Sequence, residues 1–490
     1  MTEQQRFQLR RDIPVENGYD LLVAGGGPAG TVAAIAAARE GLRTVLVEAT
    51  GALGGMGTSG LVSSWYCLGN NVHSMVGGVV VEICEALYER GAIEPGRGPE
   101  QWQRTKRGFG FDPEALKRLL DELCARAEVE VRFATRVIDA EVSEVKAGGE
   151  TANRTVAGAV LHGIEGYSFV AAKAFIDATG DAVLAEQCGV VCRAAGRDTE
   201  RIMPPTLCAR VTGIDYDRFD RRRDQQTAVD TAVADGFFSQ PDRHVPGIFR
   251  TGEHEGILNA GHLFGMDALS TQSLSHGYAQ GRRLAEEYVR FFRNYLPGCE
   301  ETHLSATAAL MGVRESRRIL GEYELSWDDF VARRTFPDQI GIYCKQVDVH
   351  VYDTTPEEYA RFEREFTEAG RPADGEYYGM PYGILVPRGF TNLWAAGRCV
   401  STDVRVNGSL RDQPGCMLLG QAAGTAAAQH VTTGEPACAL NTRILVETLR
   451  TRGANLPQER LSETMSRCLP ASEPSGMQAP PTPPGAERAR

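Results

Sequence analysis

The chain has 490 residues, of which 42% are hydrophobic and 24% are charged, so it can bury more than one globular core. Its 64 acidic residues outnumber its 52 basic residues, and the net charge of −12 argues against nucleic acid or an anionic membrane as partner. The polar N-terminal stretch lacks the apolar segment of a secretory signal, and no apolar run is long enough for a membrane helix. We therefore expect a cytoplasmic protein.

The 12 cysteines are scattered along the chain without a C-x-x-C motif. This pattern argues against a disulfide framework or an iron–sulfur cluster, and predicts mostly buried thiols.

The segment 19–48 has the pattern of a strand, a glycine-rich turn, a helix and a second strand. Gly25, Gly27 and Gly30 form G-x-G-x-x-G: the first permits the turn, the second lets a pyrophosphate approach, and the third lets the helix pack on the strand. The helix N-terminus offers free N–H groups to phosphates. Glu48 ends the second strand, where a carboxylate can accept hydrogen bonds from a ribose diol. The segment therefore predicts a dinucleotide site.

Further elements follow in chain order. A glycine-rich loop is expected at 51–60 and another loop at 91–110. A helix is predicted over 78–90, and a second begins after Asp112, which can cap it, with Pro113 in its first turn. The short strands expected next are near 129–133, 136–143 and 156–163 and suggest a β-meander, and another strand is expected over 170–177.

Composition changes after about residue 200, where strands alternate with charged helices such as 278–295. Strand-like apolar runs return over 377–398, and a helix of small residues is predicted over 414–430. The residues from Pro470 onward are rich in proline, which predicts a disordered tail.

Three features favour FAD as the dinucleotide. A second glycine loop, 54–58, can run beside the pyrophosphate; a strand ending at 177–181 follows the meander; and the late segment 392–398 precedes the helix that begins near Pro414. That helix N-terminus, together with Arg411, would stabilise negative charge on reduced flavin. No second G-x-G-x-x-G stands between a predicted strand and a predicted helix, so a pyridine-nucleotide domain is not expected.

These motifs resemble the FAD-dependent oxidoreductase family allied to heterodisulfide reductase A, and more distantly the fumarate reductase and succinate dehydrogenase flavoproteins. The stretches that carry the resemblance are YDLLVAGGGPAG, LGGMGTSGLV, IDATGDAVLAEQCG, MGVRESRRILGEYELSWDDF, VDVH, YGMPYGILVP, NLWAAGRCVS and GSLRDQPGCMLLGQAAGTAAA. The resemblance implies an α/β fold: a Rossmann-like FAD-binding domain of the glutathione reductase type, discontinuous in sequence, with an inserted α+β substrate or cap domain.

The chain departs from these relatives in three places. It lacks the cysteine clusters of the heterodisulfide reductases. The loop around Gly55 lacks the His that binds FAD covalently in fumarate reductases, so non-covalent FAD is expected. Val404 and Asn407 stand in a stretch that often carries His in relatives, which argues against a His-based proton transfer from this loop.

The predicted divisions follow from these motifs. They are 17–200 and 377–435 for the two parts of the FAD-binding domain, 201–376 for the substrate or cap domain, 436–469 for a C-terminal helical segment and 470–490 for the tail. The predicted cofactor-binding residues are Gly25, Gly27, Pro28, Ala29, Gly30, Glu48, Gly55, Met56, Thr58, Val137, Thr179, Gly180, Asp181, Gly397, Arg398 and Arg411.

His350 is the strongest candidate for a proton acceptor. Strand-like alternation would place Asp348 and His350 on one face, where the carboxylate could raise the imidazole pKa. Arg314 is a candidate clamp for a substrate carboxylate, and a helix there would put Arg318 on the same face. Arg411 is the third catalytic candidate. A structural role is the alternative for each of these residues.

Weaker candidates are also present. His73, His262 and His276 are rivals to His350, while Tyr378 and Tyr382 could be acids or aromatic walls, with core packing as the alternative. Cys416 lies in the first turn of the predicted 414–430 helix, where the helix dipole could lower a thiol pKa.

The sequence thus predicts an enzyme that oxidises a small organic metabolite by hydride transfer to FAD. The alternatives are a flavin-dependent reductase of an activated C=C bond and an electron-carrier subunit of a larger complex. The electron acceptor is unknown, and the sequence leaves homo-oligomerisation open.

Overall fold

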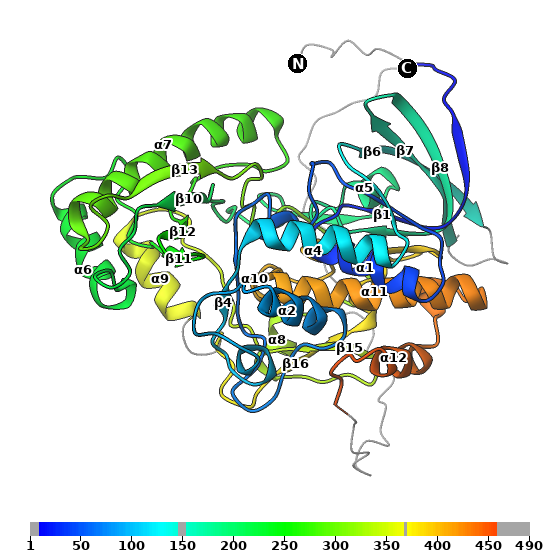
Figure 1. Ribbon diagram of the computed structural model, residues 1–490. Helices are drawn as coiled ribbons and strands as arrows, with labels where there is room; N and C mark the ends of the chain where they lie inside the picture. The colour runs from blue at the N-terminus through cyan, green and yellow to red at the C-terminus, as the bar shows by residue number, and fades with distance from the viewer. Residues whose placement is uncertain (1–8, 146–152, 367–369, 458–490) are drawn as a thin grey trace, which may run out of the picture. The chain divides into compact units, whose positions relative to one another are not determined.

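A seven-stranded sheet forms the centre of the computed structural model, which describes residues 9–145, 153–366 and 370–457 (Figure 1). Its order is β5-β2-β1-β8-β7-β6, and β17 pairs with the C-terminal end of β8. The strands are β1 (Val15–Ala24), β2 (Thr44–Val47), β5 (Glu130–Arg132), β6 (Arg136–Val145), β7 (Asn153–Gly163), β8 (Gly166–Asp177) and β17 (Leu393–Ala395). The Pro-rich tail predicted from residue 470 lies outside the described residues.

The parallel part of this sheet confirms the predicted Rossmann-like core. β1 pairs in parallel with both β2 and β8, with Leu22 opposite Val45 and Phe175. All four residues of β2 are buried, as expected for a parallel strand covered on both faces. β6, β7 and β8 form an antiparallel meander, so the predicted meander is shifted by one strand, because β5 pairs in parallel with β2 instead.

Two helices pack backbone to backbone beside this sheet. They are α1 (Pro28–Arg39) and α11 (Gln413–Thr433), both rich in Ala and Gly and buried over most of their length. A Cβ atom on Gly420 would lie 2.1 Å from the carbonyl oxygen of Ala29, and one on Gly424 would lie 2.2 Å from that of Ala33. Only glycine permits this approach, so the late helix is fixed against the first one.

The remaining helices include the two predicted between residues 78 and 126. Asp112 caps α4 through a hydrogen bond from the Glu114 N–H at 2.8 Å, as predicted. Apart from the helices of the second core described next, the remaining helices are α2 (Val79–Glu89), α3 (Glu100–Gln103), α4 (Pro113–Arg126), α5 (Val183–Gln187), α8 (Trp327–Val331), α10 (Val404–Leu410) and α12 (Thr442–Thr451). Short 3-10 turns cover Gly55–Gly57, Tyr382–Ile384 and Ala437–Ala439.

A second core lies under the green and yellow elements at the left of Figure 1. A four-stranded antiparallel sheet, in the order β11-β12-β10-β13, packs against α6 (Arg221–Ala234) and α7 (Thr271–Tyr295). Its strands are β10 (Ala209–Thr212), β11 (Gly247–Arg250), β12 (Glu255–Asn259) and β13 (His303–Thr307). α9 (Pro356–Phe366) lies on the same side of the molecule. Strands alternate with charged helices here, as the composition predicted.

Side chains from residues 325–349 pack in the main hydrophobic core and not in this second core. Leu325, Phe330, Ile340 and Tyr343 belong to the main hydrophobic cluster with α1 and α11. The predicted domain boundaries therefore stay a prediction, because the segment 201–376 contributes to both cores.

Three local predictions were wrong or incomplete. Residues 317–319 form a strand rather than a helix, because they pair with β9 (Cys192–Ala194) as β14 (Arg317–Ile319). Residues 347–350 form no strand, although β15 (Gln339–Tyr343) just before them pairs with β16 (Tyr378–Pro381). The predicted loop 91–110 contains α3 and β4 (Phe109–Gly110), which pairs with β3 (Ser64–Trp65).

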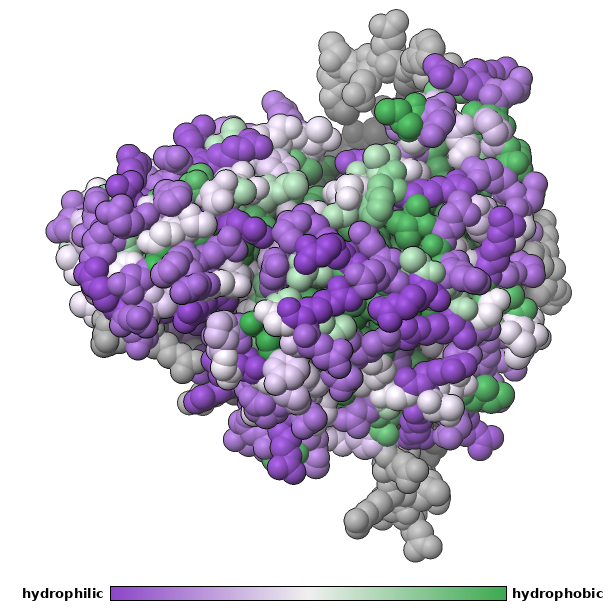
Figure 2. Space-filling view, viewed as in Figure 1, coloured by the Kyte–Doolittle hydropathy of each residue, from purple (hydrophilic) through white to green (hydrophobic). Residues whose placement is uncertain are grey.

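The face of the molecule in Figure 2 is mostly hydrophilic, with small scattered apolar patches. Within the described ranges, every helix is either too short or too polar to cross a bilayer.

Replacing Gly424 with Ala tests the packing of α1 on α11. The added methyl group would overlap the Ala33 carbonyl oxygen, so we expect the free energy of unfolding to fall by about 1–3 kcal/mol. Urea unfolding measures this free energy. Gly51→Ala is the matched control, because its Cβ would meet no atom within 4 Å. Equal stability of both variants would contradict the close backbone contact.

Candidate functional site

A cavity of about 1760 Å³ lies at the carboxyl ends of the parallel strands. Its lining includes the residues that directly follow β1, β2, β8 and β17, which are Gly25, Glu48, Ala178 and Ala396. This edge is where open α/β sheets bind their ligands. The cavity continues from these strand ends to the second core, where it is lined by Ile248, Phe249 and other residues.

The glycine turn after β1 has the geometry that the motif predicted. Gly25 has φ +94°, and a Cβ there would lie 2.6 Å from the Ala178 carbonyl oxygen. Gly30 packs so closely on the turn that its Cβ would lie 1.8 Å from the Gly25 oxygen. Gly27 differs, because its Cβ would meet no atom within 4 Å although the residue lines the cavity. No side chain caps the N-terminus of α1.

Glu48 is buried at the end of β2 and lines the cavity. Its Oε2 accepts a hydrogen bond from the Gly26 N–H at 2.7 Å, and its Oε1 accepts one from the Thr50 N–H at 2.7 Å. The carboxylate therefore braces the glycine turn as well as facing the place where the motif predicts a ribose.

The residues after β8 are tied to those after β17. Arg398 donates to Oδ1 of Asp181 at 2.6 Å and to the Val313 carbonyl oxygen at 2.8 Å. Ser316 also donates to Asp181 Oδ1, at 2.6 Å. Gly180 has φ +75° beside the Arg398 guanidinium. These contacts fix the predicted residues 179–181 and 397–398 as one wall.

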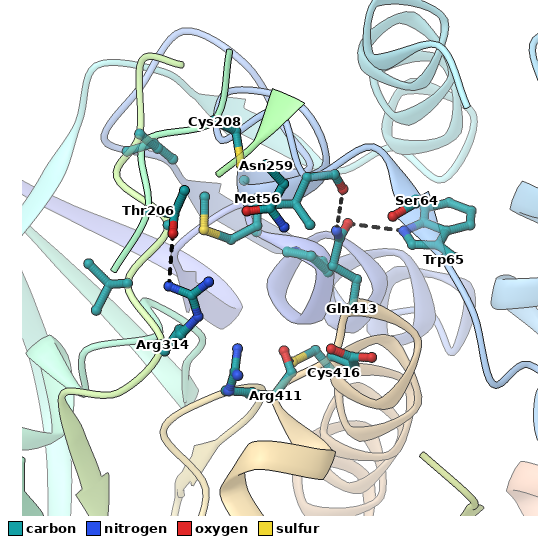
Figure 3. A pocket seen from close by; sticks show the side chains of 18 of the residues that line it. Met56, Ser64, Trp65, Thr206, Cys208, Asn259, Arg314, Arg411, Gln413 and Cys416 are labelled. Carbon is teal, nitrogen blue, oxygen red and sulfur yellow. Dashed lines mark hydrogen bonds between the residues drawn. The ribbon is translucent and has the colours of Figure 1, made fainter. Parts of the chain in front are cut away.

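The start of α11 forms another wall (Figure 3). Gln413 accepts a hydrogen bond from Trp65 Nε1 at 3.0 Å and donates to the Val62 carbonyl oxygen at 2.6 Å. Arg411 donates to Asp348, at 2.7 Å to its carbonyl oxygen and at 3.1 Å to Oδ2. The expectation that the helix dipole could lower the Cys416 thiol pKa was wrong, because burial raises that pKa to about 12.

Arg314 is buried yet lines the cavity. Its guanidinium donates to the Pro204 carbonyl oxygen and, at 3.1 Å, to Thr206 Oγ1 (Figure 3). Among the described residues, no acidic side chain forms an ion pair with it. Burial, followed by the nearby Arg411, lowers the pKa of Arg314 to about 10, so it remains charged at neutral pH. A buried cation facing a cavity without an anionic partner is a candidate anion site.

His350 lies on the same cavity and is 5% exposed. Its Nε2 is 3.3 Å from Oδ1 of Asp348, so the predicted pair meets although no strand places it. Burial and then the Arg314 charge lower the pKa of His350 well below its usual range, against the opposing effect of Asp348. The ring is therefore neutral at neutral pH and able to accept a proton.

Two further histidines surround His350, and sequence reasoning ranked one low and missed the other. Nε2 of His262 is 2.9 Å from Nδ1 of His350. The ring of His244 lies 5.0 Å from that of His350 and 5.4 Å from that of His262. Burial, and then His262, lowers the pKa of His244 to about 4. Only tertiary structure assembles this cluster, so no spacing in the sequence signals it.

The cavity brings together most of the predicted site residues. Those that line it are Gly25, Gly27, Pro28, Ala29, Glu48, Gly55, Met56, Val137, Thr179, Gly180, Asp181, Arg314, His350, Gly397, Arg398 and Arg411. Gly30 and Thr58 lie outside the lining. Thr58 is fully buried and donates to the Leu53 carbonyl oxygen at 2.5 Å, so its hydroxyl shapes the glycine loop.

Among the weaker candidates, Cys416 lines the cavity, whereas the others lie outside its lining: His73, His262, His276, Tyr378 and Tyr382. Tyr378 bonds to Ser409 at 2.7 Å in the core, and Tyr382 donates to the Ala437 carbonyl oxygen at 2.9 Å. His73 and His276 are exposed. Core packing therefore explains Tyr378 and Tyr382, whereas His73 and His276 are surface residues.

Comparison with protein families gives a match over most of the chain. A family model described as FAD dependent oxidoreductase matches residues 20–450. A dihydrolipoyl dehydrogenase from Trypanosoma brucei brucei is 61% identical over 47 residues, a stretch that covers only 10% of this chain and 10% of that enzyme. The narrower relation to heterodisulfide reductase A remains a prediction.

Two solved structures are also similar, at low sequence identity. A geranylgeranyl bacteriochlorophyll reductase-like protein from Thermoplasma acidophilum is 16% identical, with a TM-score of 0.48, over 89% of this chain and 84% of that one. A p-nitrophenol 4-monooxygenase from Pseudomonas putida DLL-E4 is 13% identical, with a TM-score of 0.45, over 89% and 85%.

The family match identifies the dinucleotide as FAD, and the residues of the cavity fit it. The open space above Gly27 is where the motif predicts the pyrophosphate, and the uncapped N-terminus of α1 supplies N–H groups there. Glu48 and the 397–398 wall lie on the same cavity as Arg314 and His350. FAD held by the first group of residues would therefore share its cavity with the second.

Replacing Gly27 with Ala separates cofactor binding from folding. Because the added methyl group meets no protein atom but enters the cavity, we expect FAD affinity to fall at least about tenfold, or about 1.4 kcal/mol, with unchanged stability of the apoprotein. Fluorescence titration with FAD and thermal unfolding measure the two effects. Gly51→Ala should change neither. Wild-type FAD affinity in Gly27→Ala would place the pyrophosphate elsewhere.

Proposed function

We propose, since the chain belongs to the FAD-dependent oxidoreductase family and is an enzyme of that kind, that it oxidises a small organic metabolite that carries a carboxylate. The observation that carries this proposal is the unpaired Arg314 guanidinium, which lines the same cavity as the glycine turn and His350. A carboxylate would supply the charge that the described surroundings of Arg314 lack.

Each of the chain's polar groups then has a distinct part in the reaction. Arg314 binds and orients the carboxylate, while His350 accepts the proton that leaves the substrate's O–H, N–H or C–H group. Asp348 stabilises the resulting imidazolium, and Arg411 holds Asp348 in place. Bound FAD supplies the acceptor for the two electrons.

Reduction of an activated C=C bond is the second candidate. Burial and the neighbouring Arg411 lower the pKa of Arg314 to about 10, which makes this guanidinium a better proton donor than an exposed arginine. In that direction Arg314 would protonate the substrate and an outside donor would supply the electrons.

Anaerobic mixing with a metabolite panel tests the proposed oxidation. The panel pairs each hydroxy or amino acid with its amide, and we expect only the carboxylates to bleach the flavin absorbance. Arg314→Gln should raise the substrate concentration needed for half-maximal bleaching about 10–100-fold, since it loses a charge-assisted pair. Exposed Arg405→Gln is the control. Equal bleaching by acids and amides would contradict the anion site, and reoxidation of dithionite-reduced enzyme by an unsaturated carboxylate alone would favour the reductase.

The pH dependence of kcat/KM tests the role of His350. A base must be unprotonated, and its pKa is lowered, so activity should persist below pH about 6.5, the ordinary pKa of His, and fall only in more acidic buffer. Arg314→Gln removes a cation that lowers the His350 pKa, so the fall in activity on the acidic side of the profile (the acid limb) should move to higher pH. Asp348→Asn removes an anion and should move it to lower pH. His350→Ala should slow bleaching without releasing FAD. An acid limb that stays in place in both charge variants would assign it to another group.

A further inference from the structure

His350 belongs to a chain of buried polar groups that continues away from the cavity. His262 joins it through the 2.9 Å contact between His262 Nε2 and His350 Nδ1. On its other side, Nδ1 of His262 lies 2.8 Å from Oδ2 of Asp242, which is fully buried. The three residues come from separate segments, before β11, after β12 and after β15.

Asp242 is held as a carboxylate. Burial alone would raise its pKa, but His262 together with other donors outweighs that effect and lowers it. Its Oδ1 accepts hydrogen bonds from the Tyr359 hydroxyl at 3.0 Å and from the backbone N–H of His244 at 2.9 Å. Its Oδ2 receives neither of these bonds and forms the 2.8 Å ion-pair contact with His262 Nδ1, although neither atom has a hydrogen bond of normal geometry among the described residues.

The positions of the ring protons follow from these contacts. A lone pair on His262 Nδ1 would repel the carboxylate oxygen 2.8 Å away, so Nδ1 carries the proton. Neutral His262 then presents a lone pair at Nε2, and His350 must donate to it from Nδ1. Neutral His350 is left with its lone pair at Nε2. This order leaves the Nε2 lone pair 3.3 Å from Asp348, a carboxylate that Arg411 also contacts, whereas the opposite order would place a lone pair 2.8 Å from the buried Asp242.

We propose that Asp242 and His262 fix the tautomer of His350, so that Nε2 is the atom that takes a proton. This inference rests on the proposed role of His350 as proton acceptor. When Nε2 gains its proton, the imidazolium donates from Nδ1 to His262 and from Nε2 towards Asp348 Oδ1, 3.3 Å away. Asp242 and His262 act through His350 and are positioning residues.

The same geometry could serve a metal ion instead. His244, His262 and His350 offer ligand atoms that all lie within 4.8 Å of one another. The planes of the His244 and His262 rings are stacked at an angle of 15° to each other. The nitrogen lone pairs lie in the ring planes, so those of the two rings lie in nearly parallel planes. Shared binding of one ion requires them to converge, which favours the proton chain.

Nitrogen NMR of the FAD-loaded enzyme labelled with ¹⁵N-histidine tests the tautomers directly. At neutral pH we expect His350 protonated at Nδ1 and bare at Nε2, with the two signals assigned by their loss in His350→Gln and His262→Gln. In Asp242→Asn, the amide can donate to His262 Nδ1 and should reverse both tautomers. Exposed Asp230→Asn makes the same charge change and should leave them unaltered. A His350 protonated at Nε2 in the wild-type enzyme overturns the inference.

Kinetic and metal measurements complete the test. With the fastest carboxylate of the panel, Asp242→Asn should slow flavin bleaching roughly 100-fold, within the range of general base catalysis, with little change in the half-saturating concentration. The histidine control is His276→Gln, which replaces an exposed histidine on α7. If no compound bleaches the flavin, the proposed function fails while the NMR result still decides the tautomer. Stoichiometric Zn²⁺ binding that His262→Gln abolishes would overturn the proton chain.

Discussion

The backbone contact between α1 and α11 is the constraint on which the candidate site depends. Gly420 and Gly424 let α11 lie against the carbonyl oxygens of Ala29 and Ala33. Both helices begin at the cavity, since Pro28 and Gln413 line it. One N-terminus therefore supplies the anion site of the dinucleotide motif, and the other carries Arg411 and the Gln413 that Trp65 contacts. A side chain at either glycine would move the second set relative to the first.

The cations beside the cavity are held in two different ways. Arg411 is paired with Asp348, whereas the hydrogen bonds that hold Arg314 within the described part of the chain come from neutral oxygens of Pro204 and Thr206. The first arrangement stabilises a carboxylate next to His350. The second orients a full charge towards the cavity without neutralising it, so its electrostatic effect is available to a ligand. Burial strengthens this effect because little water screens the guanidinium.

The parts of the structure that could be predicted from sequence depend on local chemistry. The glycine turn, Glu48 and the Asp112 cap each require particular residues within a short segment, and each has the expected geometry. The strand at Arg317–Ile319 was missed because its partner β9 lies far away in sequence. Asp242 and His244 gave no signal, since their role depends on two other segments that only the tertiary fold brings to them. Cys416 was misjudged because burial outweighs the helix dipole.

The uncompensated charge of Arg314 links two equilibria that a fully paired arginine would leave independent. Its cation weakens the basicity of His350, and an anion bound to it cancels part of that effect. By thermodynamic reciprocity, a protonated His350 must then favour the bound anion to the same degree. Anion binding is therefore coupled to proton uptake. In the proposed reaction, an anionic ligand would meet a stronger base than a neutral one of the same shape, so the cavity would discriminate by reactivity as well as by fit. An anionic product would leave more readily once His350 has passed on its proton.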